Sequence, residues 1–448
     1  MICSAPKRPK GGGPMSREMH FGIFTLGTGN HTAGWRHPGA DDSFLDMSVN
    51  QRIAAIAERG LFDLLFVGDG LSANLSSHPS FTVRLEPLTM LAALAMTTSH
   101  LGLGATMSTT YSDPYTVARA FASLDHISNG RAAWNAVTTA AAASGGNFGR
   151  VHPDHEKRYG RAGEFIDVVR GLWDCWDDDA IIRDLATGRY LDPSRIRALN
   201  HVGEHFSVRG PMNMARSPQG QPVILQAGGS ERGQDLAARS ADVVFSVVQD
   251  LDEAKLAYAS LKERVRRHGR NPDHVTILPG VMPIVGKTDA HAFEILGTLQ
   301  SYLDSTEGLA LLSARLGTDV SKYPLDGPIP DLPLPDTSHG FARAMLAKAQ
   351  RDHMTLRDLY NLTAAARGHW VLCGSAQTIA DTLERWFVEE AADGFNVMPA
   401  YFPGAFDDFV DQVIPELQRR GLYRKAYSGT MLRDHLGLPR PDCGAYKQ

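Results

Sequence analysis

The stretch VILQAGGSERGQDLAA (223–238) combines a short apolar run, a turn of small residues and a helical pattern. Gly229 lets a ligand approach the backbone closely, and Ser230 can cap the helix that follows. The free N–H groups and the dipole of a helix N-terminus favour a phosphate. Gln234 and Asp235 stand where a nucleoside-triphosphate loop has lysine and then serine or threonine. Taken alone, the loop is either an anion site or a capped turn without a ligand.

Polar side chains also stand near the ends of three apolar runs. Asp69 ends FDLLFVGD, Thr106 lies in LGLGATMST, and Asn135 lies in RAAWNAVTT. Hydroxyl and amide groups at adjacent strand ends form a neutral polar floor, which suits hydrogen bonds to a heterocycle better than acid–base chemistry. The alternative is structural, because aspartate can cap a helix and threonine can satisfy local backbone groups.

Two further pairs of residues have suitable types and spacing. His155 and Tyr159 are four residues apart at the start of an expected helix, so they share one face and could reach an anion. They could equally be two surface residues. His31 and Trp35 follow the first expected strand and could line a pocket, although a lone loop histidine is more often structural.

Other kinds of site are not expected. The sequence has no GxSxG elbow, no HExxH and no paired cysteine and histidine ligands, so we expect no metal site. No nucleophile or obvious acid–base pair stands out either, and no catalytic residue is assigned. A site of this kind is best explained if a cofactor carries the chemistry.

Composition narrows the partners and the compartment. A net charge of −5 without a block of basic residues disfavours nucleic acid. The apolar runs are too short or interrupted to cross a membrane, and the N-terminus lacks the apolar region of a secretory signal. The four cysteines are scattered, which favours a reducing, cytoplasmic location.

Eight strands that alternate with helices are expected to position these residues. The strands are expected at 20–26, 62–69, 101–109, 131–139, 222–227, 241–247, 275–286 and 394–399. Continuous apolar strands indicate parallel pairing with helices outside, and about eight of them favour a (β/α)₈ TIM barrel in the α/β class. We expect a disordered leader at 1–15 and one barrel domain at 16–448. Long insertions at about 177–220 and 301–368 are expected over the C-terminal face of the strands.

Longer stretches resemble the bacterial-luciferase-like, flavin-dependent monooxygenases. They run in the same order from about His20 to Pro441: FDLLFVGD, LGLGATMSTTYSDPYTVARAFASLDHISNGRAAWNAVTT, HEKRYGRAGEF, GPMNMARSPQGQPVILQAGGSERGQDLAA, VLCGSAQTIADTL and VIPELQRRGLYRKAYSGTMLRDHLGLPRP. Within this family the chain is most similar to the subgroup of nitrilotriacetate, EDTA, dibenzothiophene-sulfone and long-chain-alkane monooxygenases and pristinamycin synthase A.

The resemblance implies a two-component monooxygenase. Reduced FMN (FMNH₂), supplied by a separate NAD(P)H:FMN reductase, would react with O₂ to a C4a-peroxide that oxygenates a small organic substrate. A homodimer or homotetramer is expected. The cofactor contacts carried over by motif are Asp69, Thr106, Asn135, His155, Tyr159, Gly229 and Ser230.

The resemblance also implies a ligand for the loop within 223–238 and a place for the substrate. Gly229 and Ser230, with Tyr159 nearby, would hold the single phosphate of FMN, which needs neither Mg²⁺ nor a lysine. The substrate-pocket candidates, under a lid formed by 301–368, are His31, Trp35 and His339.

Two other functions stay open. The same barrel could serve a deazaflavin-dependent dehydrogenase, although the long matches favour the FMN subgroup. The chain could also bind a flavin without catalysis, although known luciferase relatives of that kind lack large parts of the barrel.

Overall fold

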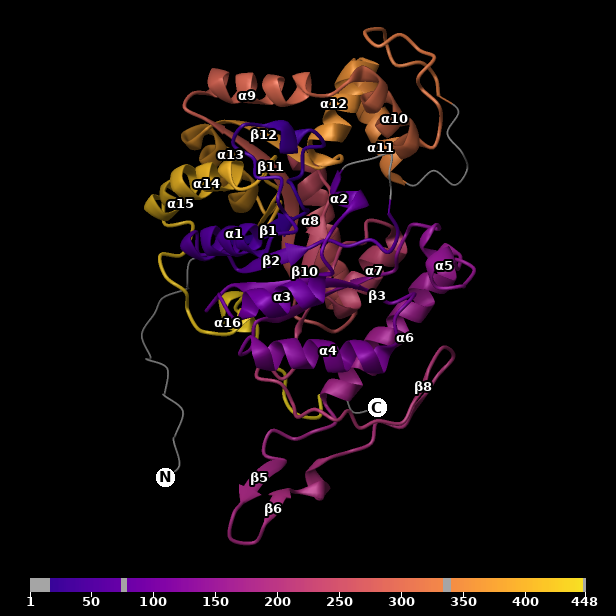
Figure 1. The fold of residues 1–448 in the computed structure, drawn as a ribbon, viewed down its shortest axis with the longest axis vertical. Helices are drawn as coiled ribbons and strands as arrows, with labels where there is room; N and C mark the ends of the chain where they lie inside the picture. Colours follow the sequence, from indigo (N-terminus) through magenta and orange to yellow (C-terminus); the bar gives the residue numbers. More distant parts are fainter. Residues whose placement is uncertain (1–16, 74–78, 333–339, 446–448) are drawn as a thin grey trace.

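The computed structural model describes residues 17–73, 79–332 and 340–445, and these residues form a closed barrel of eight parallel strands (Figure 1). The order around the barrel is β10-β9-β4-β3-β2-β1-β13-β11, and pairing of β11 with β10 closes it. The expected (β/α)₈ barrel is therefore confirmed. The expected leader and His339 lie outside the described residues. The barrel strands are β1 (His20–Thr25), β2 (Leu64–Val67), β3 (Gly102–Ser108), β4 (Ala132–Val137), β9 (Val223–Gln226), β10 (Val243–Ser246), β11 (Thr276–Gly286) and β13 (Gly394–Val397).

Helices surround the barrel, and most begin at a side chain that accepts a backbone N–H, as Ser230 does for α7. Their inner faces pack on the strands in one large apolar cluster, in which Trp134 of β4 contacts Phe165 and Trp173 of α6. The helices of this layer include α1 (Met47–Arg59), α3 (Pro87–Ala95), α4 (Pro114–Ile127), α6 (His155–Trp173), α7 (Glu231–Ser240), α8 (Leu251–Arg267) and α13 (Ala376–Val388). Two short helices, α2 (Pro79–Thr82) and α5 (Ser144–Asn147), lie in the connections after β2 and β4.

Alternate residues of the strands fill the barrel interior. Phe24, Phe66 and Leu225 belong to a second apolar cluster, distinct from the one under the helices. Thr106 and Asn135, which are register partners on β3 and β4, follow the same alternation. The interior near the carboxyl ends of the strands is therefore apolar on one side and polar on the other.

A ninth strand, which the sequence did not predict, extends the sheet. β12 (Trp370–Ser375) pairs with the second half of β11, from Val281 to Gly286. β11 has eleven residues, and its first half belongs to the barrel. One long strand thus supports the barrel and an outer extension.

The insertion at 301–368 lies at the carboxyl ends of the strands, as expected. It follows α9 (Asp289–Ser301) and contains α10 (Ser305–Leu316), α11 (Gly340–Arg351) and α12 (Leu356–Ala366). These helices share their own apolar cluster, which includes Leu312 and Leu359. The end of α12 rests on the loop after β1, because Thr32 N–H donates to the carbonyl of Ala364 at 2.9 Å.

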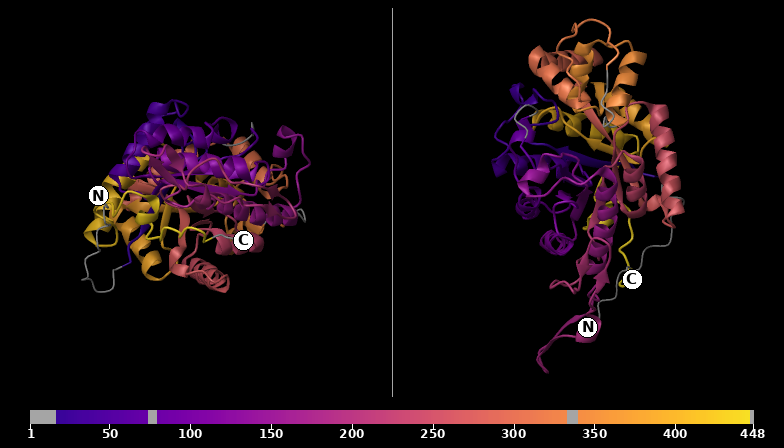
Figure 2. Two further views of the ribbon diagram at one scale, coloured as in Figure 1. Left: turned by 90° about the horizontal axis from the view of Figure 1, so that it is seen from below. Right: turned by 90° about the vertical axis from the view of Figure 1, so that its right-hand side faces the viewer.

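The insertion at 177–220 lies at the opposite end, so its expected position was wrong. Its two small hairpins are β5 (Ile181–Asp184) with β6 (Arg189–Leu191) and β7 (His201–Val202) with β8 (Ser207–Val208). Gln219 donates to the carbonyl of Ala132, the first residue of β4, at 2.9 Å. β5 and β6 lie far from α10–α12 in Figure 1 and in the right-hand view of Figure 2. The segment runs from the end of α6 back to the start of the barrel strand β9, so it lies at the amino ends of the barrel strands.

The C-terminal segment closes the amino end of the barrel. Before this segment, α14 (Gly404–Asp408), a π-helical turn (Phe409–Val413) and α15 (Ile414–Arg419) follow β13 and pack beside α1 and α13 in the helical layer. The closing segment follows α15 and contains α16 (Leu432–His435). Between α15 and α16, Arg424 forms an ion pair with buried Asp63, which immediately precedes β2. Arg433 likewise reaches Asp242, immediately before β10, at 3.3 Å. The carboxyl end remains the one where a ligand can enter.

Candidate functional site

The loop between β9 and α7 forms a tight backbone turn. A Cβ on Gly233 would lie 2.8 Å from the Cα of Gly228 and 3.0 Å from the hydroxyl oxygen of Tyr159, so the loop, α7 and α6 meet closely here. A Cβ on Gly229 would meet nothing within 4 Å. Ser230 Oγ accepts the N–H of Gly233 at 3.1 Å. The turn therefore presents open space beside a helix N-terminus and a phenol, which is a suitable cradle for a phosphate.

The start of α6 brings the two expected aromatic residues to this cradle. Asp154 caps the helix by accepting the N–H of Lys157 at 2.8 Å. One turn along, the rings of His155 and Tyr159 lie 4.7 Å apart, so they share a face as expected. The structure thus brings His155 and Tyr159 to the loop that carries Gly229.

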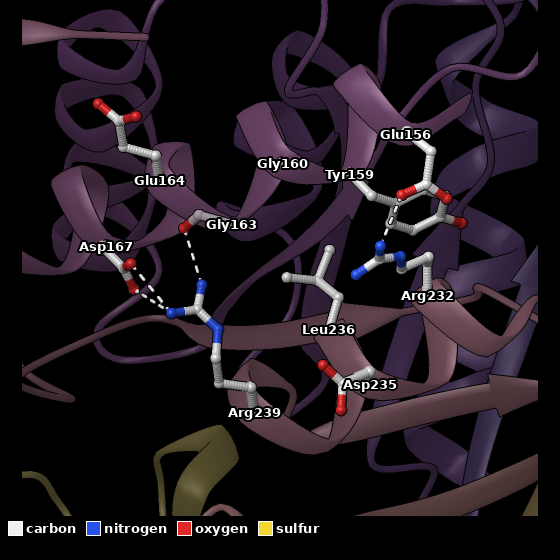
Figure 3. A pocket seen from close by; sticks show the side chains of 10 residues that line it. All are labelled: Glu156, Tyr159, Gly160, Gly163, Glu164, Asp167, Arg232, Asp235, Leu236 and Arg239. Carbon is white, nitrogen blue, oxygen red and sulfur yellow. Dashed lines mark hydrogen bonds and ion pairs between the residues drawn. The ribbon is translucent and has the colours of Figure 1, made fainter. Parts of the chain in front are cut away.

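A groove of about 450 Å³ continues from Tyr159 between α6 and α7 (Figure 3). The ion pair of Arg232 with Glu156, at 2.8 Å, crosses it near Tyr159. At the far end Arg239 binds Asp167 at 3.0 Å. The groove is lined by charged groups that are already paired, so it joins the two helices rather than offering an unpaired charge.

Thr106 and Asn135 meet inside the barrel. Asn135 Nδ2 donates to Thr106 Oγ1 at 2.9 Å, and this hydroxyl donates to the carbonyl of Val67 at 2.7 Å. Asn135 Oδ1 is buried and has no hydrogen-bond partner among the described residues. A buried acceptor without a partner is costly, so a ligand with an N–H group would stabilise this arrangement.

Asp69 lies just beyond the end of β2, where it faces Arg84. The Nε atom of Arg84 is 3.6 Å from its carboxylate. Burial raises the pKa of Asp69, while the N–H of Gly70 and the charge of Arg84 oppose this effect. The sequence prediction placed Asp69 at the strand end correctly but did not include its arginine partner.

The apolar side of the mouth is a layer of three phenylalanines. The ring of Phe24 lies 5.0 Å from Phe66 and 5.7 Å from Phe245, which come from β1, β2 and β10. The ring of His369 stacks on Phe245 at 4.8 Å. The motif search missed this layer, although the alternation of inward residues along the strands carried the signal.

A hydrogen-bonded row beside the cradle was also missed. Arg158 donates to His152 Nε2 at 2.6 Å, so the proton of the neutral imidazole lies on Nδ1, which donates to the hydroxyl of Tyr111 at 2.7 Å. Burial, and then the charge of Arg158, lower the pKa of His152, which favours this neutral form. The row ties the loop after β3 to the start of α6 and so positions His155 and Tyr159.

The three substrate-pocket candidates have different outcomes. His31 is fully buried in the loop after β1, and burial lowers its pKa to about 4. Its Nδ1 accepts the N–H of Ala33, and its Nε2 has no partner among the described residues. Trp35 lies in the same loop and is 44% exposed. His339 lies outside the described residues.

Two other expectations concern metals and membranes. Among residues 17–73, 79–332 and 340–445, no group of three histidine, cysteine, aspartate or glutamate side chains could hold a metal ion. No helix in this part of the chain is long and apolar enough to span a bilayer.

The sequence is similar to known proteins over nearly its whole length. The chain is 46% identical over 430 residues to N-acetyl-S-(2-succino)cysteine monooxygenase of Bacillus subtilis (strain 168), covering 95% of this chain and 98% of that protein. It is 44% identical over 444 residues to nitrilotriacetate monooxygenase component A of Aminobacter aminovorans, with the same coverage.

Solved structures of other proteins have a similar fold. A riboflavin lyase, solved with modified FMN and riboflavin, overlaps with a TM-score of 0.83 at 28% identity, over 96% of this chain and all of that chain. An F420-dependent secondary alcohol dehydrogenase overlaps with a TM-score of 0.55 at 14% identity, over 88% of this chain and 98% of that chain, which shows the fold alone. The family model of the luciferase-like monooxygenases matches residues 19–393. The chain therefore belongs to the luciferase-like monooxygenase family, and it is a monooxygenase.

Proposed function

We propose that this monooxygenase uses reduced FMN, held at the carboxyl end of the barrel. The observation that carries the proposal is the open space over Gly229, beside the N-terminus capped by Ser230 and the hydroxyl of Tyr159. A phosphate there would accept backbone N–H groups at the positive end of the helix dipole. The relative solved with modified FMN supports the choice of flavin.

The flavin ring would extend from the phosphate toward the polar strand ends. Asn135 Oδ1, buried and without a partner among the described residues, would accept an N–H of the reduced ring. Asp69 and His155 complete the set, and Thr106 fixes the amide of Asn135. Bound reduced FMN would supply the electrons that activate O₂.

The remaining tasks belong to the chain itself. The phenylalanine layer under the mouth and the helices of 301–368 would exclude water, so that one oxygen atom of O₂ is transferred to the substrate and the reduced oxygen is not released as hydrogen peroxide. The polar groups at the strand ends would orient the ring. No side chain needs to act as a nucleophile.

FMNH₂ would come from a separate NAD(P)H:FMN reductase, by diffusion. A relative named component A supports a system of more than one protein, and the sequence has no GxGxxG dinucleotide fingerprint. A homo-oligomer and a cytoplasmic location stay predictions. The deazaflavin reading is weaker, because its support is a likeness of fold alone.

The test combines the protein with NADH, FMN, a purified NADH:FMN reductase and ¹⁸O₂. Two probes differ in chemistry: nitrilotriacetate carries three carboxylates, and dibenzothiophene sulfone is neutral. We expect one probe class to give a product whose formation requires the protein, with ¹⁸O in the product oxygen that mass spectrometry detects. Hydrogen peroxide alone, at the rate of the reductase without the protein, would contradict the proposal.

A further inference from the structure

Two basic side chains lie over the phenylalanine layer. Both come from the short link between α12 and β12, at the edge of the 301–368 insertion. The guanidinium carbon of Arg367 lies 4.8 Å from the ring centroid of Phe24, within the range of a cation–π contact. His369 lies parallel to Phe245, with an interplanar angle of 6°. The apolar half of the mouth therefore carries a cation directly above it.

Arg367 is held in this position from below. Its Nη2 donates to Asn30 Oδ1 at 2.9 Å. Asn30 is fully buried, and its Nδ2 donates to the carbonyls of Phe24 and Pro399, both at 3.2 Å. Because both amide hydrogens are used, the amide oxygen is fixed toward the guanidinium.

The backbone of Arg367 adds to the positioning. The residue ends α12 in the left-handed conformation, with φ of 54°. A non-glycine residue in this region is uncommon and marks a position where the surroundings fix the chain. Side chain and backbone together make the orientation of this cation largely independent of a ligand, which lowers the entropy cost of binding one.

The cation lies across the mouth from the polar strands. Thr106 and Asn135 belong to β3 and β4, whereas Phe24 and Phe245 belong to β1 and β10, each two strands away around the barrel. Arg367 and Phe245 are partly exposed, so a small molecule can approach them. If the flavin occupies the polar half, the half under Arg367 is the substrate side.

We propose that Arg367 binds a carboxylate of the substrate, so that the substrate class is small organic carboxylates. The inference rests on the proposed function. A planar guanidinium donates two parallel hydrogen bonds to a carboxylate, and these are strong in a site that excludes water. A neutral substrate that filled the mouth would displace water from the guanidinium without offering an anionic acceptor. The phenylalanine layer would hold the carbon skeleton.

The test measures binding before turnover. Nitrilotriacetate is titrated calorimetrically into the anaerobic FMNH₂ complex of the wild type, Arg367→Gln and Arg367→Lys. The expected result is a dissociation constant about ten- to hundredfold higher in Arg367→Gln, with an intermediate value in Arg367→Lys. Arg357→Gln is the matched control. It removes another guanidinium of α12, and this guanidinium pairs with Asp326 at 2.7 Å, away from the mouth. The control should bind nitrilotriacetate as the wild type does.

The outcomes separate this inference from the proposed function. If FMNH₂ does not bind the wild type, the proposed function fails. If FMNH₂ binds equally to wild type and Arg367→Gln, and nitrilotriacetate binds both equally or neither, the carboxylate assignment is overturned. The carboxylate assignment is also overturned if the protein oxygenates dibenzothiophene sulfone but not nitrilotriacetate, and if the KM for the sulfone is the same in the wild type and in Arg367→Gln. A selective loss of carboxylate binding in Arg367→Gln supports the inference.

Discussion

Adding one methyl group at Gly229 tests the phosphate cradle with little risk to the fold. The new Cβ would meet no protein atom within 4 Å, and its backbone conformation is not one reserved for glycine. The Gly229→Ala variant should therefore change the free energy of unfolding by no more than about 1 kcal/mol, mostly through the unfolded chain. If the phosphate lies in this open space, the methyl group would clash with the phosphate and with no part of the protein.

The expected loss of affinity follows from the contact that is blocked. A hydrogen bond from a backbone N–H to a charged group contributes about 1.5–3 kcal/mol, so the Kd of FMNH₂ should rise about ten- to 150-fold. Gly233→Ala is the matched contrast, because its Cβ would lie 2.8 Å from the Cα of Gly228. Overpacking there should cost about 1–3 kcal/mol of stability as well as affinity.

The assay pairs two measurements on each variant. Urea unfolding, followed by tryptophan fluorescence, gives the change in stability. Anaerobic titration with FMNH₂ gives the Kd. The reasoning is refuted if Gly229→Ala binds FMNH₂ as tightly as the wild type does, or if it is destabilised as much as Gly233→Ala.

Three further predictions concern the cradle and the closed end of the barrel. Ser230→Ala should lose about 1 kcal/mol of stability with its cap, and FMNH₂ binding should weaken by about 1–3 kcal/mol. Tyr159→Phe should weaken FMNH₂ binding by a similar amount with stability unchanged; unchanged affinity in both variants would remove the phosphate assignment. Burial alone would raise the pKa of Asp63, but the charges of Arg424 and His20 and their hydrogen bonds lower it from 3.8 to about 2. Because the folded pKa is depressed, this stabilisation is present above about pH 4 and is lost as the pH falls toward 2, which urea unfolding at pH 7, 4 and 3 would follow. Asp63→Asn should cost about 3–5 kcal/mol at pH 7 by leaving Arg424 buried without its anion, and it should flatten the loss of stability below pH 4; an unchanged acid profile would contradict this origin.

The barrel strands were predictable because each is a continuous apolar run. The strand expected at 275–286 is β11 (Thr276–Gly286), and that at 241–247 contains β10 (Val243–Ser246). Burial on both faces requires such runs, and turn residues mark their ends. The sequence pattern and the tertiary packing therefore favour the same elements.

The additions to the barrel were less predictable. WVLCGS (370–375) is a short apolar run whose partner is the outer half of β11, and nothing in β11 indicates that it serves two neighbours. The segment at 177–220 is polar and irregular, which suggested a cover for the active site. Its position between α6 and the barrel strand β9 indicated the amino ends, because the chain must return there before β9 begins.

Part of the candidate site was also predictable from the sequence, and part was not. Thr106 and Asn135 were expected at neighbouring strand ends, and their hydrogen bond of 2.9 Å agrees. Their roles as cofactor contacts stay a proposal. Arg367 was not foreseen, because it comes from a link between α12 and β12, neither of which was predicted. Residues carried by unpredicted elements cannot be assigned from spacing.

The most direct test of the central claim compares two reduced flavins. The protein is titrated anaerobically with FMNH₂ and with reduced riboflavin, which has the same ring system but lacks the phosphate. The account predicts saturable binding of one FMNH₂ per chain and affinity for reduced riboflavin at least about tenfold weaker, the value of one charged hydrogen bond. Equal affinity for the two flavins, or no saturable binding of FMNH₂, would contradict it.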